Sequence, residues 1–319
     1  MNPFRRLIEP RLPSVALGLS EVGAGVVALE RRRDTFSVRR AGYTHLPEGL
    51  LHPRFDETNI TSPVELTETL AELVTSVGLL KQRRWSVALP ENSTRTAILT
   101  LESVPTGRGE LEEMLRWKSE RVLGARLDEL RVSRQRLVPD AQGQPRYLLS
   151  AIRLDVLAEY ESVFASLGWH AGLVLPRHMG EAWWLMRDGS YPSDALLVSA
   201  YSDGFTAVLL RRRQPLLVRN VVCDEEDRND ELFRFLLFYR DRLATAPGME
   251  GGAPSETIER LLVMGRDIDP RATSAIVEET LSVAPRTLRA EDVRLALPPG
   301  ELDFSLLAAP AGLAALKWA

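Results

Sequence analysis

The sequence predicts an α/β protein made of two similar halves, with a small α+β unit inserted into the first half. One observation is a segment that occurs twice. Residues 15–33 (VALGLSEVGAGVVALERRR) and residues 195–213 (ALLVSAYSDGFTAVLLRRR) align without a gap. The other is that both halves continue with β-rich apolar runs alternating with stretches of helical periodicity. Self-similarity at a fixed offset indicates a duplicated structural unit.

Each copy of the repeated segment predicts a β-hairpin. An apolar run is followed by a short break containing glycine, a second apolar run and three arginines. Nearly continuous Val, Leu and Ala residues are typical of strands that are buried on both faces. The arginines and the polar residue after them, Asp34 or Gln214, predict a solvated hairpin tip. Two ordinary hairpins could match by coincidence, but the break and the arginine triplet stay in register, which favours duplication.

Composition places the chain among ordinary globular proteins. It has 319 residues, 45% hydrophobic and 26% charged, with a formal net charge of −4. This length accommodates two domains of about 150 residues each. The slight acidity argues against a nucleic-acid binder, which would carry a basic surface. Cys223 is the only cysteine, so we expect no internal disulfide, no metal or redox role for this thiol, and a cytosolic location.

No apolar stretch reaches the about 18 residues that a membrane-spanning helix needs. The apolar tail, residues 304–319, is interrupted by Pro310 and Gly312 and is expected to form a buried terminal helix. Residues 3–8 (PFRRLI) lack the apolar core of a signal peptide. We expect a frayed terminus there, with weak contact to an anionic membrane surface as the alternative.

In the first half, the clearest helix is predicted for residues 63–77. Ser62 is a suitable N-cap, Pro63 a suitable first helical residue, and Gly78 a suitable end. Residues 43–51 are expected to be a loop. Strands are predicted for residues 85–89 and 173–175. A helix over residues 181–187 carries Trp183 and Trp184, which we expect in the core.

Residues 95–167 predict the order strand–helix–strand–strand–helix, which is a compact α+β insertion. The strands are expected at residues 95–101, 130–137 and 146–152, and the first helix at residues 110–124. The second helix begins at a capping Asp155 and ends at Gly168. At helical spacing, one broad face of the first helix gathers the apolar side chains Leu111, Met114, Leu115, Trp117 and Val122.

The second half continues with an acidic, solvated connector at residues 224–230 (DEEDRND). Helices are predicted for residues 230–243 and 273–281. Strands are predicted for residues 260–264 and 293–297, and a loop rich in Pro and Gly for residues 246–255.

Several of these strings resemble the PilM family, cytoplasmic actin-like proteins of bacterial type IV pilus assembly. More distantly, the chain is similar to FtsA and to the cytoplasmic part of the type II secretion platform protein GspL. The matching strings are residues 46–49 (LPEG), 63–79, 87–90 (VALP), 95–101, 110–130 (ELEEMLRWKSERVLGARLDEL) and 155–169. The string at 110–130 is the most specific, and the resemblance covers most of the chain.

The resemblance implies an actin-like (ribonuclease H-like, duplicated) fold with an FtsA-type 1C insertion. Residues 1–13 would be an N-terminal tail. Residues 14–92 and 170–190 would form subdomain 1A, and residues 93–169 subdomain 1C. Residues 191–319 would form subdomain 2A. Subdomain 2B would be reduced or missing, because only the acidic connector occupies its place.

The resemblance also implies where a nucleotide would bind, and the residues there fit poorly. Actin-like ATPases hold phosphates with the backbone of small-residue turns and Mg²⁺ with an aspartate after each first strand. Here the aspartate positions are Ser20 and Ala200, and Glu21 would repel a phosphate. We therefore expect degenerate loops, no ATP or Mg²⁺ cofactor and no catalysis. The residues at these positions are Ser20, Gly23, Gly25, Ala200, Ser202, Gly204, Thr206 and Gly265.

No other catalytic pattern stands out. The four histidines, His45, His52, His170 and His178, show no metal-ligand spacing, and neither GxSxG nor CxxC occurs. Gly23 and Gly25 lack the third glycine of a dinucleotide fingerprint.

The function implied by the resemblance is that of a non-catalytic scaffold (a pseudo-ATPase) in type IV pilus biogenesis. It would be cytoplasmic and reach the inner membrane only through partners. These are the short cytoplasmic peptide of a PilN-type membrane protein, the pilus assembly ATPase and platform proteins, with self-association possible and no nucleic acid. The peptide would lie against the strand at residues 95–101 and the helix bearing Trp117, with Arg95, Ile98, Leu99 and Trp117 as candidate contacts; Trp117 also suits the core. The alternatives are an actin-like ATPase that binds ATP and polymerises, and a GspL-like component of type II secretion.

Overall fold

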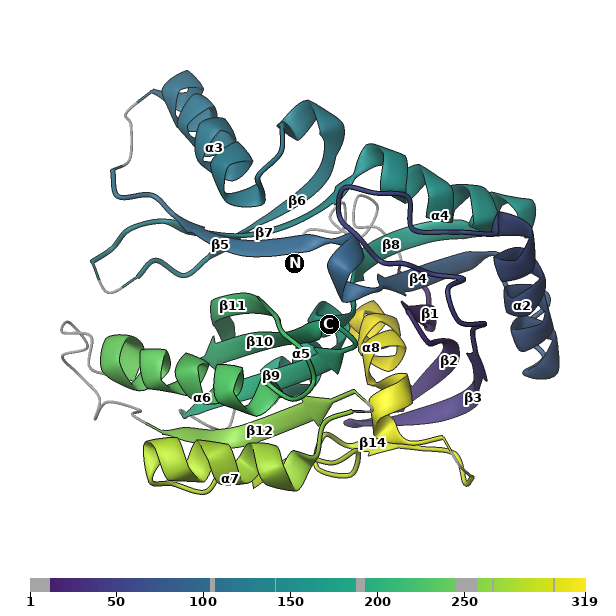
Figure 1. Cartoon of the computed structure of the whole chain (residues 1–319). Helices are drawn as coiled ribbons and strands as arrows, with labels where there is room; N and C mark the ends of the chain where they lie inside the picture. The colour runs from purple at the N-terminus through teal and green to yellow at the C-terminus, as the bar shows by residue number, and fades with distance from the viewer. Residues whose placement is uncertain are drawn as a thin grey trace.

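Two sheets that share a five-strand order organise the chain, and the first has β14 as an additional edge strand (Figure 1). The computed structural model describes residues 12–103, 107–140, 142–187, 193–244, 257–265, 267–300 and 302–319. The first sheet has the order β14-β3-β2-β1-β4-β8. Its strands are β1 (Val15–Ser20), β2 (Gly23–Arg32), β3 (Thr35–His45), β4 (Arg84–Leu89), β8 (His170–Pro176) and β14 (Leu295–Ala296).

The second sheet repeats this pattern with the order β11-β10-β9-β12-β13. Its strands are β9 (Asp194–Tyr201), β10 (Gly204–Arg211), β11 (Gln214–Val222), β12 (Ile258–Met264) and β13 (Arg286–Thr287). In each half, three antiparallel strands are followed by a strand parallel to the first of them. The predicted duplication is therefore present in three dimensions, and the continuous apolar runs of β1 and β9 are buried as expected.

Helices cover the sheets and fill the space between them. Helices α2 (Pro63–Ser76) and α4 (Leu154–Ser166) share one core with the first sheet, and α6 (Arg228–Phe238) and α7 (Pro270–Leu281) share another with the second. A third core joins the facing sides of both sheets through α5 (Arg177–Arg187) and α8 (Phe304–Ala315). The two halves thus have separate outer cores and a common central one.

The central helices cross at glycines. A Cβ atom on Gly312 would lie 1.8 Å from the backbone oxygen of Gly180, and one on Gly180 would lie 2.3 Å from the backbone oxygen of Ala309. Only glycine permits so close an approach. The expected buried terminal helix is present as α8, which runs through Pro310. Pro310 packs against Gly18 of β1, where an added Cβ would lie 2.8 Å from the proline ring.

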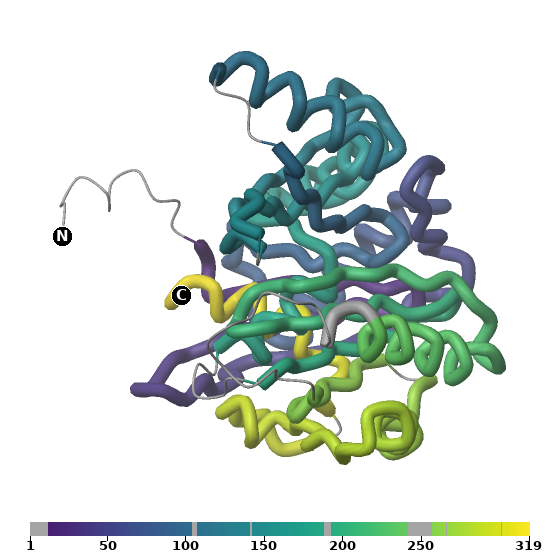
Figure 2. Tube along the Cα trace, turned by 90° about the vertical axis from the view of Figure 1, so that its left-hand side faces the viewer, coloured from purple at the N-terminus to yellow at the C-terminus, as the bar shows by residue number. Residues whose placement is uncertain are grey.

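A third sheet belongs to the insertion, which stands above the first two sheets (Figures 1 and 2). Its order is β5-β7-β6, with β5 (Arg95–Thr100), β6 (Leu130–Leu137) and β7 (Arg146–Arg153). Helix α3 (Arg108–Leu123) closes a small core of its own over this sheet. The predicted element order of the insertion is present. Figure 2 also shows the C-terminus beside the start of β1, where Lys317 Nζ lies 3.4 Å from Ser14 Oγ.

Some predicted details of the helices were wrong. Asp155 does not cap α4; the N-cap is Arg153, and the Asp155 carboxylate pairs with its guanidinium. Helix α5 begins at Arg177, four residues earlier than predicted. The helix predicted over residues 230–243 changes after Phe238 into a π-helical turn, Tyr239–Ala244. Trp184 is buried as expected, whereas Trp183 is only partly buried.

The strand predictions missed some residues. Strand β3 continues to His45, into the loop expected from residue 43. Strand β8 is longer than the predicted strand at residues 173–175, and β14 is shorter than the one predicted at residues 293–297. Strand β13 was not predicted. The predicted loop at residues 246–255 lies outside the described residues.

The arginine triplets are not simply solvated. Arg211 forms an ion pair of 2.6 Å with the buried Asp194, and its side chain is only 12% exposed. Arg31 donates a hydrogen bond of 3.1 Å to the backbone oxygen of Trp318. In the acidic connector, Arg228 is likewise buried and donates to the backbone oxygen of Tyr201 at 3.0 Å. The guanidinium groups of these arginines therefore bind a buried carboxylate or backbone oxygens, although the local sequence predicts that they lie at the surface.

Candidate functional site

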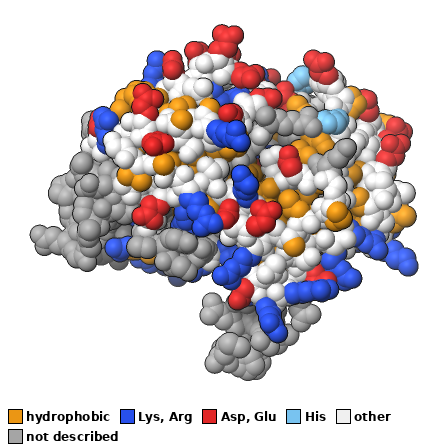
Figure 3. Space-filling model, turned by 90° about the horizontal axis from the view of Figure 1, so that it is seen from below, with side chains coloured by type: hydrophobic (Ala, Val, Ile, Leu, Met, Phe, Trp, Pro, Cys, Tyr) orange, Lys and Arg blue, Asp and Glu red, His pale blue; other side chains and the backbone are white. Residues whose placement is uncertain are grey.

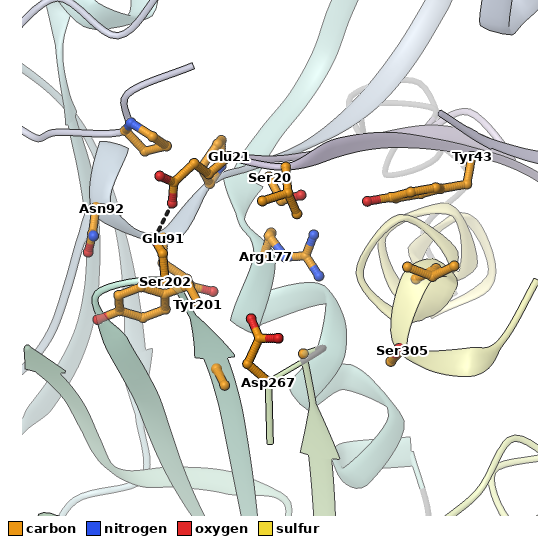
Figure 4. Close-up of a pocket in the computed structure, with 16 residues that line it drawn as sticks. Ser20, Glu21, Tyr43, Glu91, Asn92, Arg177, Tyr201, Ser202, Asp267 and Ser305 are labelled. Atoms are coloured by element: carbon orange, nitrogen blue, oxygen red, sulfur yellow. Dashed lines mark hydrogen bonds between the residues drawn. The ribbon is translucent and has the colours of Figure 1, made fainter. Parts of the chain in front are cut away.

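The turns β1–β2 and β9–β10 face each other across a cleft at the N-terminal end of α5 (Figure 4). This is where the duplicated halves meet and where the sequence places its phosphate loops. The remaining hollow has a volume of about 100 Å³. It is lined by Ser20, Glu21, Val22, Tyr43, Pro53, Pro90, Glu91, Asn92, Arg177, Ala200, Tyr201, Ser202, Gly265, Asp267, Ser305 and Leu306.

The first turn is occupied by the chain's own groups. Ser20 Oγ donates a hydrogen bond of 3.0 Å to the backbone oxygen of Gly23. The Tyr43 side chain lies directly over Gly23, because a Cβ atom there would be 1.9 Å from Tyr43 Oη. Gly25 lies within β2, paired with Gly18. The absence of a side chain at Gly23 thus makes room for a tyrosine.

The second turn is tied to the first. Ser202 Oγ donates a hydrogen bond to the Glu21 carboxylate across the cleft, as the dashed line in Figure 4 shows. Beside it, Asp203 forms an ion pair of 3.4 Å with Arg54 of the first half. The Glu21 carboxylate of the first half therefore occupies the hydrogen-bonding hydroxyl of Ser202 in the second half.

The two other glycines at predicted contact positions face backbone. A Cβ atom on Gly204 would lie 1.9 Å from the Val221 backbone oxygen, and one on Gly265 would lie 2.6 Å from that of Ala200. Both have positive φ angles, 141° and 111°. Packing of the second sheet therefore explains these glycines without a ligand.

The charges that line the hollow are mainly negative. Glu21, Glu91 and Asp267 contribute carboxylates, and Arg177 contributes the single guanidinium among the described lining residues. Arg177 is itself paired with the buried Glu181 at 3.2 Å. Burial raises the pKa of the Glu181 carboxyl, and the nearby Arg177 opposes this. Such a lining disfavours a polyphosphate.

Glu91 forms a buried polar cluster that the sequence did not reveal. Its carboxylate lies 2.5 Å from His178 Nδ1 and accepts a hydrogen bond of 2.7 Å from the backbone N–H of His178. Thr206 Oγ1, from the second half, donates to it at 3.3 Å. Burial would raise the pKa of Glu91, but the charge and hydrogen bonds of His178 lower it overall. The available signal was the position of Glu91 just after the carboxyl end of a central strand.

Two larger hollows lie beneath the insertion sheet. One has a volume of about 800 Å³ and an apolar floor from α5, including Met179, Trp183 and Met186. The other, of about 390 Å³, lies between β5 and β11 and is more polar. Val218 lines both, so the two hollows are neighbours that share this residue in their walls. Together they form what we call the channel, which runs between the insertion and the two halves.

The structure brings only one of the four candidate partner contacts to the channel. Arg95 lines its polar end, donating 2.5 Å to the Leu123 backbone oxygen and stacking 4.0 Å from the centre of the Phe55 ring. Leu99 is buried in the insertion core, and Ile98 is half-buried in β5. Trp117 is 58% exposed on α3, so the expectation that it suits the core was wrong. The guanidinium of Arg121 lies 5.6 Å from its ring centre.

Other kinds of site find little support in the part of the chain that the structure describes. It contains no group of three or more His, Cys, Asp or Glu side chains placed to hold a metal ion. Within the same ranges, no helix is both long and apolar enough to cross a bilayer. The face that carries α7 shows acidic, basic and apolar side chains interspersed (Figure 3).

Comparison with known proteins finds similar structures but no similar sequence. No protein-family model and no curated protein matches the sequence. The fold is similar to a structure described as the PilM–PilN type IV pilus biogenesis complex, with a TM-score of 0.73, 18% identity, and coverage of 97% of this chain and 98% of that one.

Two further structures share the arrangement more loosely. A Bacteroides thetaiotaomicron protein with an actin-like ATPase fold gives a TM-score of 0.51 at 12% identity, covering 97% of this chain and 98% of that one. The cytoplasmic domain of EpsL, an inner-membrane component of the Vibrio cholerae type II secretion system, gives 0.44 at 13% identity, covering 95% and 93%. This last value is too low to support an argument. The chain therefore has an actin-like fold, and its predicted structural resemblance to PilM is confirmed over almost its whole length.

Proposed function

We propose that this protein is a non-catalytic scaffold of a type IV pilus assembly machine. In this proposal, it holds the short cytoplasmic peptide of a PilN-type inner-membrane protein in the channel. The protein itself would be cytoplasmic and would reach the membrane through that partner. The observation that carries the proposal is a large channel beneath the insertion combined with a cleft that the chain's own side chains fill.

The filled cleft supports a role without nucleotide. Its hollow of about 100 Å³ is well below the roughly 300–1,000 Å³ of small-molecule sites. A triphosphate would have to displace Tyr43 from Gly23 and separate Glu21 from Ser202. It would then face three carboxylates. The Glu21–Ser202 hydrogen bond joins the two halves where a nucleotide would otherwise bridge them.

The channel supports peptide binding. Its wider end of about 800 Å³ offers an apolar floor for anchoring side chains. Its narrower end passes between β5 and β11, which are the outermost strands of their sheets among the described residues. An extended peptide binds such a place through main-chain hydrogen bonds and through pockets for alternate side chains.

Peptide binding is tested by fluorescence anisotropy with the labelled N-terminal cytoplasmic peptide of the PilN-like protein from the same genome. We expect saturable binding in the micromolar range, about −8 kcal/mol. Val218→Trp should weaken it at least tenfold, because Val218 lines both hollows and a larger side chain there would narrow them. Val64→Trp is the matched control, since Val64 is 69% exposed on α2. The proposal fails if wild-type protein gives no signal change at near-millimolar concentration, or if both variants bind alike.

Nucleotide binding is tested by calorimetric titration with Mg-ATP, which separates the scaffold from an actin-like ATPase. We expect no heat of binding with wild-type protein. The double variant Glu21→Ser/Tyr43→Ala, which removes both obstructing groups, shows whether these side chains exclude the nucleotide. Saturable heats with the wild type would contradict the proposal and favour the ATPase.

A further inference from the structure

The wall of the channel's polar end contains a buried histidine with one uncommitted nitrogen. His178 is 2% exposed, and its Nδ1 is fixed by Glu91 at 2.5 Å. Its other ring nitrogen, Nε2, is buried and has no hydrogen-bond partner among the described residues. Leaving such a group without a partner costs about 1–3 kcal/mol. A molecule bound at this end of the channel recovers that free energy if it reaches the buried nitrogen and supplies the missing hydrogen bond.

A second atom in the same wall has the same need. Thr96 Oγ1, on β5, is buried and also lacks a partner among the described residues. The two residues belong to different elements, the insertion and α5, and both line this hollow, while the two unpartnered atoms lie buried behind its surface. A ligand group lying between the insertion and α5 would therefore meet hydrogen-bonding capacity on two sides.

Apart from Asp56, which is exposed, the charged groups that line this hollow have partners. Glu91 is bound to His178, Arg54 pairs with Asp203, and Arg95 donates to the Leu123 backbone while stacking on Phe55. A charged side chain placed against His178 would lose its water, and the neighbouring charge there, Glu91, is already bound to the histidine. A neutral group that donates or accepts hydrogen bonds avoids this cost.

We infer that His178 determines which peptide the channel accepts. The inference rests on the proposed peptide-binding function and deepens it. The bound peptide places a neutral hydrogen-bonding side chain, an amide or a hydroxyl, against His178 Nε2 and Thr96 Oγ1. Its apolar side chains lie at the other end, over Met179, Trp183 and Met186 of α5. His178 thus selects the polar position of the peptide, and Glu91 fixes the orientation of the ring.

The test uses the full chain and the binding peptide from the anisotropy assay. Each neutral polar residue of the peptide is replaced in turn by its apolar isostere, Asn by Leu or Thr by Val. One such replacement should weaken binding to wild-type protein about tenfold, the loss of about one hydrogen bond. Replacements at the remaining polar positions should have smaller effects.

Two substitutions of the histidine separate its two nitrogens. His178→Asn places an amide nitrogen near the Nδ1 position, where it can still donate to Glu91, and deletes Nε2. His178→Gln places an amide nitrogen near the Nε2 position instead. We expect His178→Asn to bind the polar peptide and its isostere alike, and His178→Gln to retain a preference. His170→Asn, at an exposed position, is the control.

A measurement on unsubstituted protein keeps the test decisive if these variants fold poorly. The imidazole ¹⁵N resonances of the four histidines are recorded with and without saturating peptide. We expect the Nε2 resonance of His178 to shift and the shift to be lost with the isosteric peptide. Binding with an unmoved resonance, or unchanged discrimination by folded His178→Asn, overturns the inference while the scaffold stands. If no peptide binds, the scaffold proposal and this inference fall together.

Discussion

At the scale of single residues, the cleft is shaped by side chains in unexpected partnerships. Tyr43 covers the glycine expected to face a phosphate, and the Glu21 carboxylate accepts the hydrogen bond that Ser202 could offer to a phosphate oxygen. Glu91 binds a histidine 87 residues further along the chain. Sequence identified Ser20, Glu21 and Ala200 as poor hosts for phosphate because residue type alone decides that. It did not identify which side chains would occupy the cleft in place of a nucleotide.

Glu91→Gln tests the buried cluster. We expect a loss of about 1–3 kcal/mol at pH 7, since a charged acceptor of three hydrogen bonds becomes a neutral amide. The folded-state pKa of Glu91 is lowered, so its contribution is present above the unfolded-state value of about 4.3. It is lost as pH falls through the lower folded-state value.

Urea unfolding of both proteins at pH 7 and near pH 3 measures this. The difference in unfolding free energy between wild type and Glu91→Gln should shrink at the lower pH. A difference that stays constant or grows would show that ionised Glu91 does not stabilise the fold.

At the scale of secondary-structure elements, the sequence predicted type better than orientation. Most strands and helices lie within a few residues of their expected positions, because apolar periodicity and capping residues act locally. The orientation of α3 was not predicted correctly. Leu115 faces the core, while Trp117 and Val122 are exposed. The predicted apolar face of α3 was too broad, because the sheet beneath the helix covers only part of the apolar side chains assigned to it.

The crossing of α5 and α8 makes a stability prediction. Gly312→Ala should destabilise the protein by about 2 kcal/mol or more, because the methyl group would meet the Gly180 backbone oxygen and force the helices apart. Gly109→Ala, in α3, is the matched control. No heavy atom lies within 4 Å of an added Cβ there, so the change should be neutral or stabilise the helix by up to about 1 kcal/mol. Thermal unfolding distinguishes the two, and equal melting temperatures would refute the close crossing.

At the scale of the whole molecule, the insertion is fastened to the second half. Arg146 of β7 donates hydrogen bonds of 3.1 and 2.9 Å to the backbone oxygens of Pro215 and Leu216. The backbone N–H of Val138 donates to Gln214 Oε1 at 2.7 Å. These bonds hold the tip of the second hairpin beneath the insertion sheet and so form part of the channel. Burial lowers the pKa of Arg146, although an arginine remains charged at neutral pH.

Arg146→Met should loosen this attachment. The two backbone oxygens lose charge-assisted donors worth about 1.5–3 kcal/mol each, partly recovered through water. We expect faster hydrogen–deuterium exchange in β11 and weaker peptide binding. Arg136→Met is the control, because Arg136 lies on the neighbouring strand with an exposed side chain. Unchanged exchange in β11 with Arg146→Met would mean that these bonds do not hold the channel together.

The sequence by itself determined the duplicated hairpins, the order of elements in the insertion and the poor phosphate-binding chemistry of the loops. Each of these depends on residues near one another in the chain. Only the tertiary structure decided that Tyr43 and Glu21 fill the cleft, that Glu91 meets His178, and that the insertion leaves a channel over α5. Those features join segments that are distant in sequence, and their geometry depends on how the sheets and helices pack.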